Sequence, residues 1–157
     1  YVWESREDAK KILGEDLGFA RPDFCIVHTH HQQTVGHEMT HVISNYTSDI
    51  FFKTKFVNEG TAVCFDLSKQ DRLYQIKFWV ARNYENIEVV NFWKNGAAYA
   101  DEILYPLSGL FVSELIKNFG REKFLEFFKN QTYDNAKLVF GDKLEKVIQE
   151  FENKINT

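Results

Sequence analysis

The feature that most constrains this chain is the pentapeptide His37-Glu38-Met39-Thr40-His41, inside the run from Thr34 to Tyr46. Residues four apart lie one above the other on an α-helix, so these two imidazoles can converge on a single metal ion. Glu38 then projects about 100° around the helix axis, close to the metal without binding it. This spacing is the geometry of a metal hydrolase.

The same run carries an apolar stripe on the side away from the histidines. Its members recur at helical spacing: Val35, Met39, Val42 and Tyr46. We therefore predict a helix that packs one face into a core and lines a cleft with the other. The alternative is a solvated helix face with two ordinary histidines, because an H-E-x-x-H occurs by chance roughly once in a few hundred such chains.

Composition limits the class of protein. A chain of 157 residues fits one domain, residues 1–157, and its 44% hydrophobic and 16% aromatic content indicates a packed globular core. The net charge of -4 has no basic block, which argues against a nucleic-acid partner. No apolar run approaches the roughly 18 residues of a membrane span.

Two further features concern the compartment. Cys25 and Cys64 lie in apolar sequence without C-x-x-C spacing, so we interpret them as small buried side chains and not as a disulfide or thiolate site. The chain begins at Tyr1 without an initiator Met, so we expect a processed precursor or a domain excised from a longer protein. The expected processing of a precursor favours an extracytoplasmic location.

The remaining pattern predicts an α+β fold that is predominantly helical. A helix should begin at Ser5, which with Asp8 resembles a capping box, and the best strand is Phe24–His28. Residues 83–95 fit either an extended segment or a loop. Further helices are expected over residues 58–67, 68–82, 105–118, 122–129 and 142–155.

All five histidines lie between positions 28 and 41. His28, His30 and His31 could contribute to a metal site or its substrate cleft, or they could be surface residues. A strand sends alternate side chains to opposite faces, so we interpret at least two of them as surface residues.

Glu59 is the candidate third ligand. It lies in the segment Asn58-Glu59-Gly60-Thr61-Ala62, in which Asn58 is well placed as an N-cap. A catalytic zinc typically has three protein ligands and a water, and two His with one Glu form a known set. The alternative is that Glu59 is an acid of the first helical turn, favoured by the helix dipole.

Taken together, H-E-x-x-H followed by N-E-G-x-A resembles the gluzincin metallopeptidases, in particular the aminopeptidase-like branch and the bacterial peptidase-MA-like proteins. The resemblance implies a minimal zincin-like domain, with an active-site helix, a short N-terminal strand region and a C-terminal helical part. It also implies one Zn2+ per chain, with His37, His41 and Glu59 as ligands and Glu38 as general base.

A second segment, Tyr105-Pro106-Leu107-Ser108-Gly109, is similar to the gluzincin stretch that supplies a transition-state hydroxyl. By this resemblance Tyr105 is the oxyanion donor, and Tyr99 is a competing candidate. The alternative places Tyr105 as an aromatic residue at a helix entrance. Asp66 or Asp101 could accept a hydrogen bond from a ligand histidine.

The implied activity is zinc-dependent hydrolysis of a peptide or protein substrate by a metal-activated water. The chain lacks the G-x-M-E-N-like glutamate that captures a free amine in the aminopeptidases, so we predict an endopeptidase. The alternative is a non-catalytic zincin-fold recognition module of a larger protein.

Overall fold

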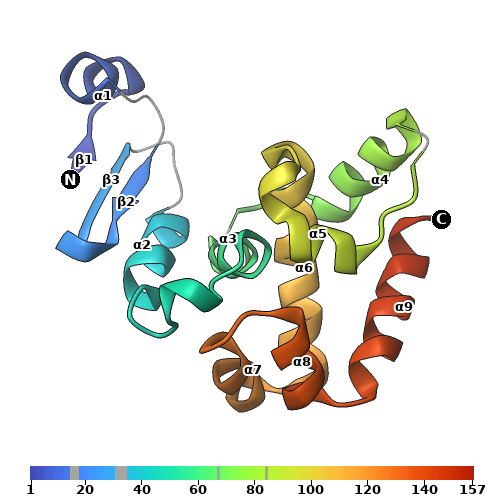
Figure 1. Cartoon of the computed structure of the whole chain (residues 1–157). Helices are drawn as coiled ribbons and strands as arrows, with labels where there is room; N and C mark the ends of the chain where they lie inside the picture. Colours follow the sequence, from blue (N-terminus) through green and yellow to red (C-terminus); the bar gives the residue numbers. More distant parts are fainter. Residues whose placement is uncertain (15–17, 31–34, 67, 84) are drawn as a thin grey trace.

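The computed structural model describes residues 1–14, 18–30, 35–66, 68–83 and 85–157, and it confirms a predominantly helical α+β fold. In Figure 1 a small sheet and one helix form one end of the molecule, and the C-terminal helices form the other. Helix α2 lies between the sheet and α3, so the predicted metal-binding helix joins the two parts. Among the described residues, no helix has the length and apolar character needed to cross a membrane.

The N-terminal part contains three strands. Its elements are β1 (Val2–Trp3), α1 (Arg6–Leu13), β2 (Phe19–Arg21), a 3-10 turn η1 (Pro22–Phe24) and β3 (Ile26–His30). β3 is central, parallel to β1 and antiparallel to β2, with Phe19 opposite His28. The predicted strand Phe24–His28 is therefore displaced by two residues, because Phe24 ends a 3-10 turn and Cys25 adopts a left-handed φ of 53°.

The start of α1 follows the sequence prediction. The Ser5 hydroxyl accepts a hydrogen bond from the Asp8 amide at 3.1 Å and so satisfies one of the unpaired N–H groups of the first turn. The helix ends at Gly14, whose φ of 78° is the left-handed conformation that glycine adopts without strain.

The two helices of the candidate site are α2 (Val35–Ser44) and α3 (Lys55–Cys64), joined through η2 (Ile50–Phe52). The N-cap of α3 is Thr54, whose hydroxyl accepts from the Val57 amide, so the prediction of Asn58 as N-cap is wrong. Glu59 consequently lies in the second turn of α3. The helix dipole therefore does not account for an acid at this position, since its effect is confined to the first turn.

The prediction of a buried apolar face on α2 is also wrong. Val35, Met39 and Tyr46 are 40%, 47% and 71% exposed, and no described residue of α2 is buried. The helix lies at the edge of the core, where Gly36 comes against the backbone of Phe65. Met39 instead faces an open apolar groove of about 810 Å³ between α2, α3, α6 and α7.

The C-terminal part is entirely helical in its described residues. Its elements are α4 (Arg72–Asn83), α5 (Val89–Asn95), η3 (Gly96–Ala98), α6 (Asp101–Phe119), α7 (Arg121–Phe128), α8 (Tyr133–Phe140) and α9 (Lys143–Ile155). Residues 89–95 form helix α5, so both predictions for this stretch, an extended segment or a loop, are wrong there, and α8 was not predicted. α6 begins four residues before Tyr105, so Tyr105 is not at a helix entrance.

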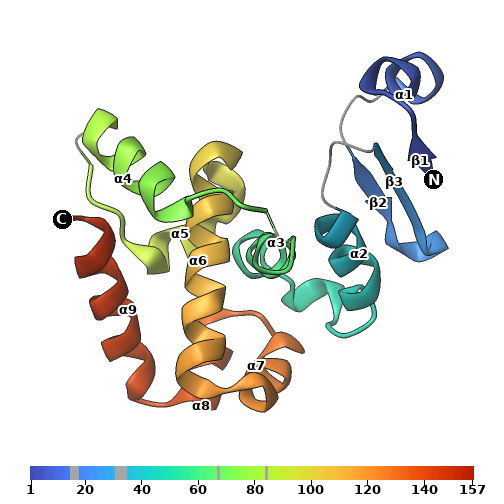
Figure 2. The same cartoon turned by 180° about the vertical axis from the view of Figure 1, so that it is seen from behind.

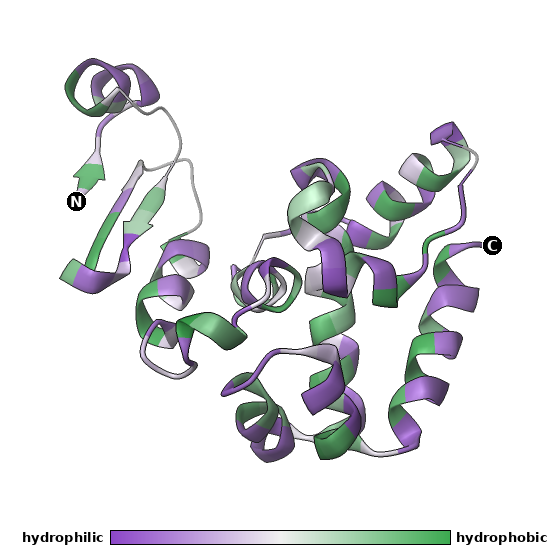
Figure 3. Ribbon diagram, in the orientation of Figure 1, coloured by the Kyte–Doolittle hydropathy of each residue, from purple (hydrophilic) through white to green (hydrophobic). Residues whose placement is uncertain are grey.

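Helix α6 runs through the middle of this part, with α3 beside it (Figure 2). The core around it holds large side chains that are fully buried, among them Phe56, Trp93, Phe111 and Phe127. Hydrophobic and hydrophilic residues alternate around α9 (Figure 3), whose apolar side is buried in this core. Phe124, Phe127 and Phe128 of α7 are buried in the same core, whereas Leu125 is 45% exposed.

A buried glutamine connects the segment between α2 and α3 to the C-terminal part. The Gln131 side chain accepts from the Thr54 amide at 3.0 Å and donates to the Ser48 hydroxyl at 3.4 Å. Its backbone carbonyl accepts from the Trp93 indole at 2.8 Å, and its amide donates to the Phe52 carbonyl at 2.9 Å. These bonds fix the start of α3, and with it the position of Glu59 relative to α2.

Candidate metal centre

Three predicted ligands from two helices meet at one point. The Nε2 atoms of His37 and His41 are 3.2 Å apart, and Glu59 Oε2 lies 3.5 Å from the first and 3.3 Å from the second. Among the described residues, this is the one group of three His, Cys, Asp or Glu side chains whose ligand atoms lie within 4.8 Å of one another. The arrangement brings together the pair from α2 and the carboxylate from α3.

These separations fit a tetrahedral zinc ion. Zinc bonds of about 2.0 to 2.2 Å in tetrahedral geometry place neighbouring ligand atoms roughly 3.3 to 3.6 Å apart. The three observed separations, 3.2, 3.3 and 3.5 Å, form a triangle of this size. Two imidazole nitrogens and one carboxylate oxygen are also a donor set that zinc accepts, with a fourth position left for water.

The electrostatics of the three ligands are coupled. Burial opposes ionisation of Glu59, but hydrogen bonds from His37 and His41 together with their charges lower its pKa to about 2. Burial likewise disfavours a charged His41, but the hydrogen bond and charge of Glu59 raise its pKa above the ordinary value for histidine. The Glu59 carboxylate is therefore ionised at neutral pH, and a metal at this site would compete with the proton that Glu59 stabilises on His41.

Asn58 is a neighbour of the His41 ring, a role that the sequence analysis gave to Asp66 or Asp101. Its side-chain amide lies 3.2 Å from His41 Nδ1, while Nε2 of the same ring faces Glu59. A metal on Nε2 leaves a proton on Nδ1, and the Asn58 amide can present its oxygen to that proton after a half-turn.

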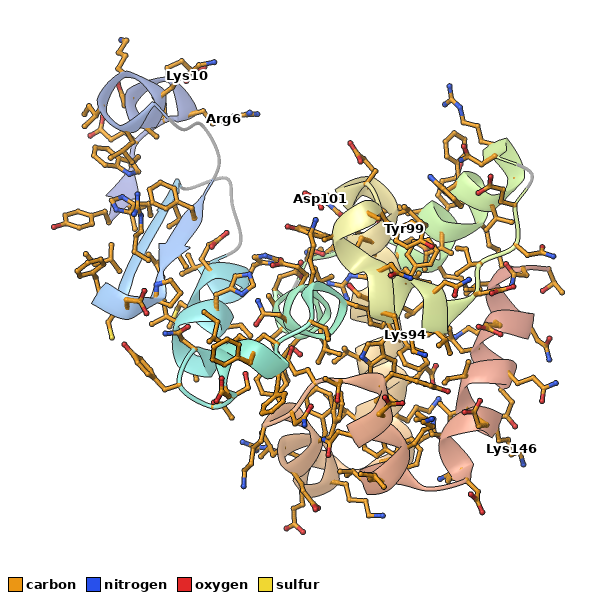
Figure 4. All side chains as sticks on the ribbon, in the orientation of Figure 1. Arg6, Lys10, Lys94, Tyr99, Asp101 and Lys146 are labelled. Atoms are coloured by element: carbon orange, nitrogen blue, oxygen red, sulfur yellow. The ribbon has the colours of Figure 1, made fainter. Side chains whose placement is uncertain are left out.

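The two aspartates proposed for that role lie elsewhere. Asp66 is 2.7 Å from Arg72, and Asp101 is 2.7 Å from Lys55, so the prediction of either as a histidine acceptor is wrong. Asp101 is the first residue of α6 and is labelled in Figure 4.

Glu38 and Tyr105 line the same cleft as the ligands, which has a volume of about 270 Å³. Burial raises the pKa of the Glu38 carboxyl, partly offset by the charges of the two histidines. The Tyr105 ring stacks on His37 at 5.8 Å between centroids. Burial, followed by the charge of Glu59, raises the pKa of the Tyr105 hydroxyl, so this group remains a proton donor throughout the neutral range.

Tyr99, the competing donor, lies against Phe92 with 3.7 Å between ring centroids and does not line the cleft. Figure 4 shows it beside α5 and the start of α6. The structure thus brings Tyr105, and not Tyr99, to the ligand histidines.

The other histidines differ in their positions. His28 is sandwiched in an aromatic stack, with ring centroids 5.1 Å from Tyr1 and 4.6 Å from Phe19. Burial lowers its pKa, and it lines neither the cleft nor the metal triad. His30 ends β3, and His31 lies outside the described residues.

Sequence reasoning missed part of the cleft wall. The opposite side is formed by Gly18, Phe19, Ala20 and Pro22, and the rim includes Asn45 and Lys53. Neither Asn45 nor Lys53 belongs to a recognisable pattern. Only their closeness in sequence to H-E-x-x-H and N-E-G-x-A could have identified them as cleft residues. The described residues that line the larger apolar groove include no His, Asp or Glu, whereas those of the smaller cleft include His37, Glu38, His41 and Glu59.

Comparison of the chain with protein-family models, with curated proteins and with solved structures gives no match. Assignment of a function therefore depends on the residues and geometry of this cleft.

Proposed function

We propose that this chain is a zinc-dependent peptide-bond hydrolase of the gluzincin type. The observation that carries the proposal is the triangle of His37, His41 and Glu59, whose ligand atoms have the separations of a tetrahedral zinc site. Glu38 and Tyr105 line the same cleft, so the groups needed for base catalysis and for oxyanion stabilisation lie beside the ligands.

Each side chain has a distinct role in this mechanism. A bound zinc would polarise the substrate carbonyl and lower the pKa of water at the site towards neutrality. Glu38 takes the proton of the attacking water and passes it to the leaving amine. Its raised pKa favours the first of these steps, because a carboxylate whose conjugate acid has a higher pKa is a stronger base. Tyr105 donates its hydroxyl hydrogen to the developing oxyanion.

The cleft favours internal peptide bonds over N-terminal ones. Its described lining contains two acids, Glu38 and Glu59, and both have roles in the mechanism. Among the described residues, no other carboxylate lines the cleft to bind a free terminal amine. We therefore assign endopeptidase activity to the domain.

Replacement of Glu38 with Gln tests the proposal. Wild-type protein should contain about one zinc per chain by elemental analysis, and should hydrolyse members of a broad peptide library. Because Glu38 is not a ligand, Glu38→Gln should retain zinc while losing roughly 100-fold or more of the turnover. His41→Ala should lose the zinc itself.

Glu126→Gln on α7 is the matched control, since it makes the same change away from the cleft. Unchanged turnover in Glu38→Gln would refute the mechanism. A zinc-loaded wild type that cleaves no peptide would support the non-catalytic recognition module instead.

A further inference from the structure

Lys53 is a cation at the rim of the metal cleft that the mechanism does not use. It immediately precedes Thr54, the N-cap of α3, and its side chain lines the cleft together with Glu38 and Glu59. Its Nζ lies 3.0 Å from the backbone oxygen of Asn45 and 3.0 Å from the Asn45 side-chain oxygen.

These two bonds hold the ammonium in place. Asn45 follows the last residue of α2, so Lys53 caps the carboxyl end of the metal-binding helix, where a cation is favoured. An ammonium group has three hydrogens to donate, and the two Asn45 oxygens take two of them. One N–H therefore remains for a ligand in the cleft.

The charge of Lys53 is not neutralised by the protein. None of the ion pairs within the described ranges includes Lys53, whereas Lys55 two residues later is 2.7 Å from Asp101. The charges of Glu38 and Glu59 would be balanced by a divalent metal at the site. The loaded cleft then has the charge of Lys53 in excess.

We infer that Lys53 binds a carboxylate of the peptide substrate close to the scissile bond. This inference rests on the proposed hydrolase function and adds a substrate class to it, namely peptides with a negative charge beside the cleaved bond. The carboxylate is either an Asp or Glu side chain, as in an endopeptidase substrate, or the C-terminus of the peptide, in which case the domain would act as a carboxypeptidase. The ammonium is already oriented by Asn45, so binding requires little further loss of side-chain freedom.

Matched peptides test this specificity. Internally quenched hexapeptides, amidated at the C-terminus, carry either Glu or Gln at each position in turn, and a second set has a free C-terminus. At one position wild type should prefer Glu over Gln by about tenfold in kcat/KM, as expected for one charge-assisted hydrogen bond. A preference confined to the free C-terminus would identify the terminal carboxylate as the source.

Variants separate substrate binding from helix capping. Lys53→Met should reduce the acid-to-amide ratio to about one, and Lys53→Glu should invert it in favour of the Gln peptides. Lys53→Arg should restore the preference for acid. Lys117→Met on α6 removes the same charge at an exposed position and should leave the ratio unchanged. If Lys53 acted only as a cap, Lys53→Met would lower the melting temperature but keep the wild-type ratio.

Binding without turnover gives a second measurement. Isothermal titration calorimetry of the preferred Glu peptide and its Gln counterpart into Glu38→Gln should show the same tenfold difference in Kd, lost when Lys53→Met is added. Wild-type hydrolysis with an acid-to-amide ratio near one at every position and at both C-termini would overturn this inference alone. An absence of hydrolysis by zinc-loaded wild type would overturn it together with the proposed function.

Discussion

Replacement of Gly60 with Ala tests the contact that sets the distance between α3 and α6. An ideal Cβ at this position would lie 2.7 Å from the Ser108 carbonyl oxygen and 2.8 Å from its carbonyl carbon. Ordinary contacts begin at 3.4 Å, so α6 must move by about 0.7 Å. The obstacle is backbone, so no side-chain rotation relieves it.

Two opposing effects decide how Gly60→Ala changes the free energy of unfolding. Alanine is intrinsically better than glycine inside a helix by about 1 kcal/mol. Overpacking of a rigid interface costs typically 1–3 kcal/mol, and a contact with backbone belongs at or above the upper end. We therefore expect Gly60→Ala to be destabilised by about 2 kcal/mol or more, which for a domain of this size lowers the melting temperature by at least roughly 4–8 °C.

The measurement is urea and thermal unfolding of wild type and Gly60→Ala, followed by circular dichroism. Asn153→Ala, at an exposed position of α9, is the control, because it gains helix propensity without a contact and should be stabilised by a few tenths of a kcal/mol. Stabilisation of Gly60→Ala by about 1 kcal/mol would show that α3 and α6 do not pack this closely. In that case the placement of Tyr105 relative to Glu59 would need revision.

Three further predictions concern the candidate metal centre. Asn58→Ala should weaken zinc binding by about 10- to 100-fold, and Asn58→Asp should weaken it less because it keeps an acceptor for His41 Nδ1. Equal zinc affinity of wild type and Asn58→Ala, measured by competition with a chelator, would refute this role. Zinc affinity should also fall by about tenfold per pH unit once the pH drops below the raised pKa of His41, because the metal must then displace one proton from the ring. A zinc affinity that stays constant across this pKa would contradict the role of His41 as a ligand. In metal-free protein the same raised pKa adds stability that is fully present below the ordinary histidine pKa of about 6.5 in the unfolded chain and is lost as the pH rises through the folded value, which urea unfolding at a series of pH values would measure.

Several parts of the fold follow from local sequence. The capping of α1 by Ser5 depends on residues three apart, and the amphipathic pattern of α9 gives its buried face directly. The apolar stripe on α2 gave a wrong prediction of a buried face, because apolar spacing identifies a helix face but not what covers it. Here Met39 borders an open groove, because α2 lies at the edge of the core.

The start of α3 was a choice between two competent N-caps. Asn58 and Thr54 are both good capping residues, and the sequence offers no local reason to prefer the earlier one. The buried Gln131 favours Thr54, because it accepts from the Thr54 amide across 77 positions of the chain. This shift moves Asn58 from a helix cap to a neighbour of His41.

The sequence alone determined the histidine pair, because the positions of two residues four apart on a helix depend only on helix geometry. It also determined that Glu38 projects about 100° around the helix axis from His37. Whether Glu59 reaches them, and whether Tyr105 or Tyr99 joins them, was decided by the packing of α3 and α6 against α2. Those contacts join segments far apart in the chain, and their energy comes from buried surfaces that no local pattern specifies.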